Sequence, residues 1–129
     1  MAESMNSTVD LTIRATSFHG MGTYGDVMVG NKAFEFYNER NVEDYIQIPW
    51  TEVEGVAAEV LFGGRIIPRF AIVTKQSGAF KFSTRDNKKT LRAIREYIPA
   101  QNIVRSPTFL DVIGLGIKRL FRIITFRRD

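Results

Sequence analysis

The sequence contains no cysteine and only one histidine in 129 residues. Without cysteine the chain has no disulfide, no thiolate metal site and no cysteine nucleophile, which fits a reducing compartment. His19 falls in a predicted turn without an evident catalytic partner, so we expect a solvated side chain. The first ten residues, MAESMNSTVD, include neither a basic stretch nor an apolar run. No secretion signal is therefore expected there.

What is present is an average globular composition with a strong asymmetry of charge. Hydrophobic residues make up 44% and charged residues 25% of the chain, which is typical of one soluble domain. Residues 1–64 carry three basic and ten acidic side chains, a net charge of −7, whereas residues 65–129 carry fifteen and four, a net charge of +11. The second half suits an anionic partner such as phospholipid, nucleic acid or an acidic protein face. Alternatively, the two halves neutralise each other within one fold.

Alternation of apolar and polar residues with a period of two predicts a series of short strands. Turn signals such as Gly30-Asn31-Lys32 and Lys75-Gln76-Ser77-Gly78 separate them. The predicted strands cover residues 9–15, 24–29, 33–37, 45–48, 53–62, 66–74 and 79–83.

One helix is predicted after the strands. Asp86 is a suitable N-cap, and Leu91, Ile94 and Ile98 follow at helical spacing before Pro99. Seven strands without intervening helices favour an antiparallel barrel or sandwich. Because seven strands followed by a closing helix is the element order of a pleckstrin-homology-like barrel, we predict that mostly β fold.

The predicted domain organisation has three parts. Residues 1–8 form a flexible N-terminus, residues 9–99 the barrel with its capping helix, and residues 100–129 a linker and a basic amphipathic tail helix. Ser106-Pro107 is a strong helix start, and a broad apolar face follows at about 100° per residue. The tail residues predicted to bind a partner or a membrane are Phe109, Leu110, Ile113, Ile117, Leu120, Phe121 and Ile124, together with the basic Lys118, Arg119, Arg122, Arg127 and Arg128.

The tail is a poor membrane span. Lys118, Arg119 and Arg122 near its middle would cost about 8–10 kcal/mol, whereas the apolar residues return about 3–6 kcal/mol. Three alternatives remain open: a helix packed on its own barrel, a helix lying in a membrane surface, or a helix docked on a membrane-protein partner.

Motifs for chemistry are few. Gly20-Met21-Gly22-Thr23-Tyr24-Gly25 matches the dinucleotide-binding pattern, but the residues after it alternate like a strand, so we expect a glycine-rich hairpin. The spacing of the carboxylates fits no common metal loop. We therefore expect no enzyme activity, cofactor, metal or small-molecule substrate. The acidic residues concerned are Glu39, Glu43, Asp44, Glu52, Glu54 and Glu59.

Basic residues of the second half could form a surface patch outside the tail. No helix-turn-helix, zinc finger or RNA-binding aromatic signature accompanies them, so we do not expect a nucleic-acid partner. The candidate patch consists of Arg65, Arg69, Lys88, Arg92 and Arg95.

Three stretches carry a resemblance to a known family: Ile48-Pro49-Trp50, Ile67-Pro68-Arg69-Phe70 and Leu91-Arg92-Ala93-Ile94-Arg95-Glu96-Tyr97. With their surroundings, about residues 7–122, they resemble the ManO family. These are small bacterial proteins of unknown function, encoded beside mannose-type phosphotransferase-system permeases. The resemblance implies a cytoplasmic accessory protein at the inner face of the cell membrane, and it brings no catalytic residues.

Together these observations support the hypothesis of a non-enzymatic regulatory protein. It would dock through its tail helix on the cytoplasmic side of a mannose-type permease and modulate sugar uptake. The alternatives are a peripheral module that binds anionic phospholipid directly and a transcriptional regulator of the mannose operon.

Overall fold

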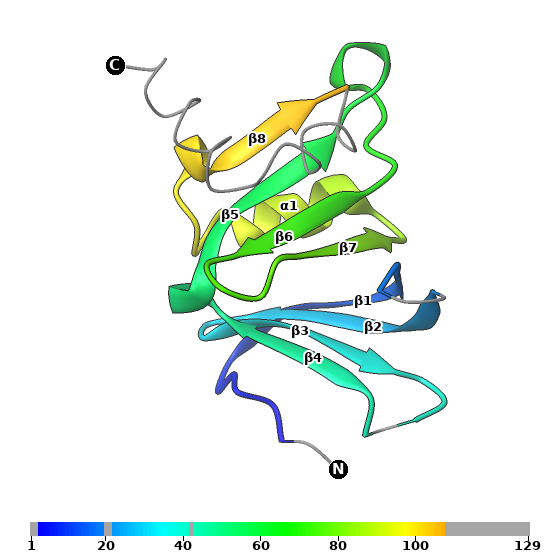
Figure 1. Ribbon diagram of the computed structural model, residues 1–129, viewed down its shortest axis with the longest axis vertical. Helices are drawn as coiled ribbons and strands as arrows, with labels where there is room; N and C mark the ends of the chain where they lie inside the picture. The colour runs from blue at the N-terminus through cyan, green and yellow to red at the C-terminus, as the bar shows by residue number, and fades with distance from the viewer. Residues whose placement is uncertain (1–2, 20–21, 42, 108–129) are drawn as a thin grey trace.

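The computed structural model describes residues 3–19, 22–41 and 43–107 of the chain. They form one β-sheet, one α-helix and three short 3-10 helices (Figure 1). The strands are β1 (Val9–Ser17), β2 (Thr23–Gly30), β3 (Ala33–Asn38), β4 (Tyr45–Pro49), β5 (Val53–Glu59), β6 (Phe70–Thr74), β7 (Ala79–Thr84) and β8 (Ile103–Ser106). The helices are η1 (Trp50–Glu52), η2 (Phe62–Gly64), α1 (Asn87–Ile94) and η3 (Ala100–Asn102).

The strands lie in the order β4-β3-β2-β1-β7-β6-β5-β8. Neighbours are antiparallel except β5 and β8, which are parallel, with Val56 opposite Ile103 and Glu59 opposite Ser106. Figure 1 shows two halves, β1–β4 and β5–β8, which meet where β1 pairs with β7. That seam is short. Ala15, Thr16 and Ser17 pair with β7, and one backbone hydrogen bond lies on either side of them, from Arg85 to Arg14 and from Phe18 to Lys81.

The mostly β prediction is confirmed, but the sheet is not the closed antiparallel barrel that we expected. All seven predicted strands are present, and β8 is an additional one. The strand β8 pairs with β5 and leaves β4 and β8 as the ends of an open, mixed sheet. The predicted strands 53–62 and 66–74 are shorter in the structure, because Gly63 and Gly64 adopt positive φ and β6 begins only after Pro68.

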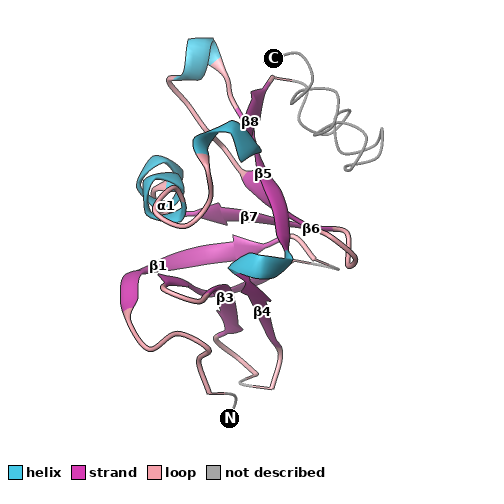
Figure 2. Ribbon diagram, turned by 90° about the vertical axis from the view of Figure 1, so that its left-hand side faces the viewer, coloured by secondary structure: helices cyan, strands magenta, loops and turns pink. Residues whose placement is uncertain are grey.

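Helix α1 begins where the sequence predicts. The Asp86 side chain accepts a hydrogen bond from the Lys89 amide at 3.1 Å and so caps the first turn. The helix ends at Ile94, earlier than the expected stop at Pro99, and a turn carries the chain onward, with the Tyr97 amide bonded to the Ile94 carbonyl at 2.9 Å. Figure 2 shows α1 on one side of the sheet, beside β7. None of the helices within the described ranges has the length and apolar character of a membrane span.

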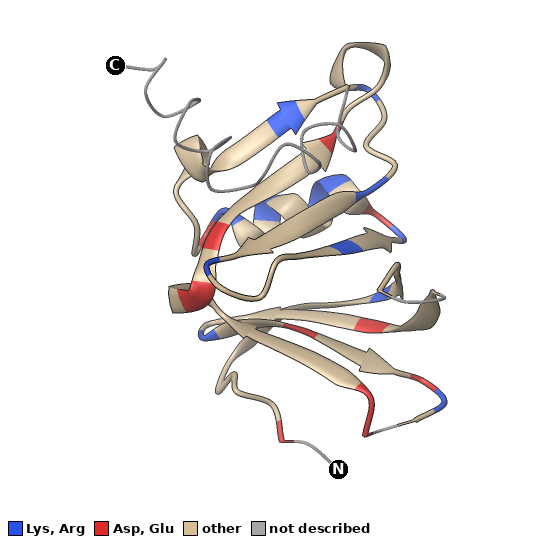
Figure 3. Cartoon of the chain, in the orientation of Figure 1, with Lys and Arg blue, Asp and Glu red and all other residues tan. Residues whose placement is uncertain are grey.

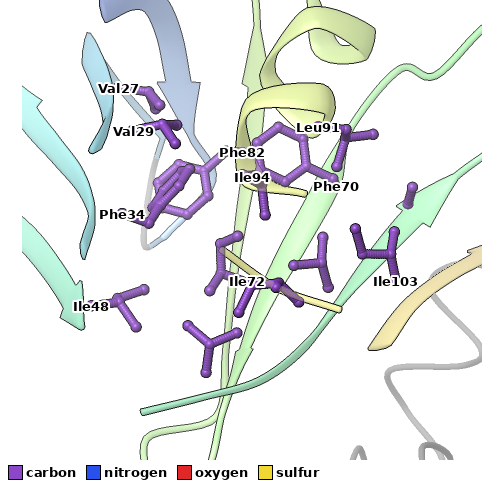
Figure 4. Close-up of a cluster of buried hydrophobic side chains, with 14 of the residues drawn as sticks. Val27, Val29, Phe34, Ile48, Phe70, Ile72, Phe82, Leu91, Ile94 and Ile103 are labelled. Atoms are coloured by element: carbon purple, nitrogen blue, oxygen red, sulfur yellow. The ribbon is translucent and has the colours of Figure 1, made fainter. Parts of the chain in front are cut away.

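The core joins both halves of the sheet to α1. Phe82 of β7 lies 4.9 Å from Phe34 of β3 and 6.1 Å from Phe70 of β6, measured between ring centroids. Leu91 and Ile94 of α1 cover this aromatic group (Figure 4). Because the same side chains contact strands on both sides of the seam, packing compensates for the few hydrogen bonds between β1 and β7.

The segment before β1 is tied to the sheet by hydrogen bonds. The Asn6 side chain accepts hydrogen bonds from the Lys32 and Ala33 amides at 2.8 Å and 2.7 Å. A Cβ at Gly30 would lie 2.4 Å from the Asn6 side chain, so glycine permits this close approach. Residues within the expected flexible N-terminus, 1–8, therefore form specific contacts with β3 and the turn before it.

Candidate functional site

The connection between β5 and β6 ends in an exposed apolar tip, formed by Leu61, Phe62 and Ile66. Their relative exposures are 37%, 74% and 48%. Leu61 and Ile66 exchange backbone hydrogen bonds at 2.9 Å and 3.2 Å, which closes the loop around Phe62. Apolar side chains grouped at such an exposed point are typical of a contact surface for a protein or a membrane.

The backbone of the apolar tip holds Phe62 outward. Phe62 has a φ of 54° and is followed by Gly63 at 68° and Gly64 at 91°. The left-handed region is open to glycine but unfavourable for a bulky residue. This local cost, together with high exposure, marks Phe62 as a candidate functional residue that the sequence pattern alone did not single out.

The described chain leaves the sheet next to the apolar tip. The carbonyl of Ser106, the last residue of β8, accepts a hydrogen bond from the Val60 amide at 3.1 Å, one residue before Leu61. The predicted tail helix begins at this point. All twelve predicted tail site residues lie outside the described residues: Phe109, Leu110, Ile113, Ile117, Lys118, Arg119, Leu120, Phe121, Arg122, Ile124, Arg127 and Arg128.

Three members of the candidate basic patch lie together on α1. Lys88, Arg92 and Arg95 are exposed at positions i, i+4 and i+7, so they follow one face of the helix and its last turn. The other two lie apart from that face. Arg69 forms an ion pair with Glu59 at 3.4 Å, and Arg65 is exposed within the loop of the apolar tip. The structure therefore divides the predicted patch among the helix, the residue before β6 and the apolar tip.

The charge asymmetry of the sequence is also an asymmetry in space (Figure 3). Acidic side chains gather on the β1–β4 half and its loops, whereas lysine and arginine predominate on α1 and the β5–β8 half. Residues 65–107 carry ten basic and two acidic side chains, a net charge of +8. The ion pair between Arg69 and Glu59 links a basic residue of the second half of the sequence to an acidic residue of the first half. It neutralises charge at this one place beside β5 and β6 and does not remove the overall separation of charge.

A cleft of about 500 Å³ lies between β4 and the turn that joins β6 to β7. One wall is the continuous stretch Asp44–Pro49, and the facing wall includes Thr74 and Ser77. His19 also lines the cleft and lies 5.3 Å from Phe80, measured between ring centroids. No sequence pattern indicates this cleft, because its walls come from segments between residues 17 and 80 that are brought together by the sheet.

The residues that follow the glycine-rich motif, and the predicted acidic residues, lie in strands and loops of the sheet. The strand β2 begins at Thr23, directly after Gly22, so the residues after the motif form a strand as predicted. The predicted acidic residues are dispersed over the loop between β3 and β4, the short helix η1 and the strand β5. Within the described ranges, no group of three histidine or acidic side chains has the arrangement of a metal site.

The residues that carry the family resemblance meet around α1. The Trp50 and Tyr97 rings stack with centroids 5.3 Å apart and planes inclined by 10°. Trp50 Nε1 donates to the Gly30 carbonyl at 2.8 Å, and the Tyr97 hydroxyl donates to the Asp10 carboxylate. The Asn87 side chain donates to the Ile67 carbonyl at 2.6 Å, which holds the second motif, residues 67–70, beside the helix start. These motif residues therefore have a direct role in holding the helix on the sheet.

The described part of the chain is thus a small β-rich fold with an open, eight-stranded mixed sheet and one covering α-helix. The chain belongs to the family described as Domain of unknown function (DUF956), whose sequence model matches residues 1–117. No curated protein matches the sequence.

Among solved structures, the fold is similar to one described as the C-terminal domain of an unknown protein from Leishmania infantum. The two share 9% sequence identity with a TM-score of 0.59, over 70% of this chain and 83% of the other. At this identity the likeness concerns the fold alone.

Proposed function

We propose that this protein is a non-enzymatic docking module that binds a mannose-type phosphotransferase-system permease at the cytoplasmic face of the cell membrane and modulates sugar uptake. The setting rests on the ManO-like residues of the sequence. The single observation that carries the docking surface is the position of the apolar tip beside Ser106, where the tail begins.

The apolar tip and the tail would act as one surface. In this proposal residues 107–126 form the amphipathic helix, and Phe62 inserts beside it between partner side chains. Arg65 and the exposed Arg105 of β8 flank these apolar groups with positive charge. Buried aromatic anchors with basic residues at the rim are typical of protein interfaces, and basic residues also suit the anionic membrane surface around a permease.

The proposal is tested by co-purification with the membrane permease, using full-length chains. Phe62→Ser and the double variant Ile117→Asp/Leu120→Asp should each reduce recovery at least tenfold. The matched control is Tyr24→Ser, which alters a side chain that is 64% exposed on the acidic half. Equal recovery of all four chains would rule out docking through the tip and the tail.

Direct lipid binding is the second candidate, because an exposed phenylalanine beside arginine also suits a bilayer interface. Sedimentation with vesicles that contain 30% phosphatidylserine, with and without the reconstituted permease, distinguishes lipid binding from permease docking. Permease docking predicts binding only to the permease-containing vesicles. Lipid binding predicts equal sedimentation with both, and a marked loss between 50 mM and 300 mM salt, since screening shortens the reach of exposed charges.

A further inference from the structure

The strand β4 is an end strand of the sheet, and its open edge forms one wall of the 500 Å³ cleft. Six consecutive residues, 44–49, line the cleft, although their side chains alternate between the two faces of the sheet. An unbroken run of this kind means that the strand borders the cleft with its backbone. The cleft is separate from the docking surface proposed above and contains no residue of the apolar tip.

The pattern of hydrogen bonds with β3 identifies the backbone groups of β4 that point away from β3. The Asn38 amide donates to the Asp44 carbonyl at 3.1 Å, and the Trp50 amide donates to the Lys32 carbonyl at 3.0 Å. In an antiparallel pair, every second residue bonds to the neighbouring strand. Positions 44, 46, 48 and 50 therefore face β3, and positions 45, 47 and 49 direct their backbone groups to the cleft. Because Pro49 has no N–H, this edge offers two donors and three acceptors.

The side chains of Tyr45 and Gln47 are held on the opposite face of the sheet from Ile46 and Ile48. Tyr45 stacks on Tyr37 with centroids 6.2 Å apart. Gln47 Nε2 donates to the Tyr37 hydroxyl at 3.0 Å and to the Glu3 carbonyl at 2.7 Å. These contacts hold both side chains away from the open edge and leave their backbone N–H and C=O groups accessible from the cleft.

The lining defines the chemistry of an occupant. The half-buried Ile46 and Phe80 provide an apolar surface, with the buried Phe36 and Ile48 behind it. Asp44 directly precedes β4, a strand of five residues that extends about 17 Å, and Glu52 lies beyond its other end, in η1. Both carboxylates are exposed, and among the described residues that line the cleft there is no lysine or arginine. Complementarity of charge therefore favours a ligand with basic groups at its ends and apolar groups between them.

We propose that this cleft binds an extended peptide segment of a partner protein, which adds to β4 as a short ninth strand. The partner backbone would pair with the N–H and C=O groups of Tyr45 and Gln47. Its apolar side chains would contact Ile46 and Phe80, and its lysine or arginine residues would lie beside Asp44 and Glu52. In strand addition the backbone bonds supply affinity and the pockets for alternate side chains supply specificity.

The test uses the full chain and a displayed library of random heptapeptides. Gln47→Pro removes the central edge donor, whereas Gln47→Ala retains that donor and removes the same side-chain bonds. Peptides selected on Gln47→Ala should carry lysine or arginine with alternating apolar residues. Their synthetic forms should bind the wild type and Gln47→Ala at least tenfold more tightly than Gln47→Pro, with matching circular dichroism of the two variants.

Three results would overturn the proposal: no enrichment, enrichment of acidic peptides, or equal affinity for the proline and alanine variants. Asp44→Asn and Glu52→Gln provide a second check on charge. Each should weaken the selected basic peptides about two- to fivefold, as expected for exposed ion pairs. Unchanged affinity in both variants would contradict the assigned ligand chemistry.

Amide exchange checks the open edge directly. In the peptide-free full chain, the amides of Tyr45 and Gln47 should exchange rapidly and those of Ile46 and Ile48 slowly. A selected peptide should slow the exchange of the Tyr45 and Gln47 amides. Slow exchange of Tyr45 and Gln47 before peptide is added would contradict the proposal, because the edge would already be occupied. A doubled molecular mass would then identify a second copy as the occupant, and an unchanged mass the chain itself.

Discussion

Glu35 shows how a single residue can join distant parts of this chain. Its side chain is fully buried and accepts hydrogen bonds from Ser4 Oγ, the Met5 amide, Asn6 Nδ2 and the Tyr37 hydroxyl. A buried carboxylate is tolerated when its lone pairs are satisfied in this way. The alternation of residues 33–37 places Glu35 on the polar face of its strand, and only the fold shows that the N-terminal segment covers that face.

Glu35→Gln should lower the free energy of unfolding by about 1.5–3 kcal/mol, the usual contribution of hydrogen bonds to a charged group. The new amide N–H groups would face donors and could not accept their bonds. Urea denaturation measures the change. The matched control, Glu96→Gln on an exposed residue, should change stability by less than about 0.5 kcal/mol. Equal midpoints for the two variants would contradict an anchoring role for Glu35.

Tyr37 should make stability sensitive to alkaline pH. Burial raises the pKa of the Tyr37 hydroxyl above its usual value of 10, and the bond that it donates to Glu35 raises it further. Because the folded-state pKa is the higher one, the contribution is complete below pH 10 and is lost as pH rises through the folded-state pKa. Urea midpoints between pH 8.5 and 11.5 should fall less steeply for Tyr37→Phe than for Tyr24→Phe. Parallel curves would exclude this contribution.

At the scale of secondary structure, α1 depends on the residues at its start. Asp86 caps the first turn, and the neighbouring Asn87 accepts hydrogen bonds from the Thr84 amide at 2.7 Å and the Thr84 hydroxyl at 3.1 Å. Thr84 and Thr90 also share a buried hydroxyl contact of 2.8 Å. Side chains therefore satisfy the backbone groups at the junction from β7 to α1, which explains why the helix can begin with only two residues between it and the strand.

Asp86→Ala should destabilise the protein by about 1 kcal/mol, the usual cost of losing an N-cap acceptor. Asp86→Ser, which retains an acceptor, should recover most of that loss. Thermal denaturation of both variants distinguishes the loss of the capping hydrogen bond from the general effect of removing a negative charge. If the serine and alanine variants melt at the same temperature, the cap does not contribute.

Local patterns predicted the elements that local forces determine. Strict alternation identified β1 to β4 closely, and the cap and spacing identified the start of α1. The strand β8 was missed because it has four residues and depends on parallel pairing with β5, 47 positions earlier at Val56 and Ile103. The sequence pattern extends the predicted strands to Phe62 and back to Ile66, whereas β5 ends at Glu59 and β6 begins at Phe70. Positive φ at Phe62, Gly63 and Gly64 shapes the exposed tip between them.

At the scale of the whole molecule, the aromatic core couples the two halves of the sheet. Phe82 contacts Phe34 and Phe36 from one half and Phe70 from the other. The sequence indicated the difference in charge between the halves, and the structure separates them in space. The sequence could not indicate the cleft, because β4 and the β6–β7 turn face each other only once the sheet has formed.

Phe82→Ala should lower the free energy of unfolding by about 3–5 kcal/mol, since it removes a fully buried ring from this shared core. Hydrogen exchange should accelerate in β2 and β3 as well as in β6. The control Phe18→Ala alters a ring that is 42% exposed and should cost less than about 1 kcal/mol. Accelerated exchange in one half alone would show that the halves are not coupled through Phe82.

The parallel pairing of β8 with β5 has a consequence for the order of folding. β8 follows α1 in the chain and is the last described strand. The edge of β5 at Val56, Ala57 and Ala58 therefore remains uncovered until β8 pairs with it. Contacts between residues so far apart in sequence form slowly, and an uncovered apolar edge is a site for aggregation. Fragments that end before Ile103 should therefore aggregate during refolding, and any shortened chain should extend through Ser106.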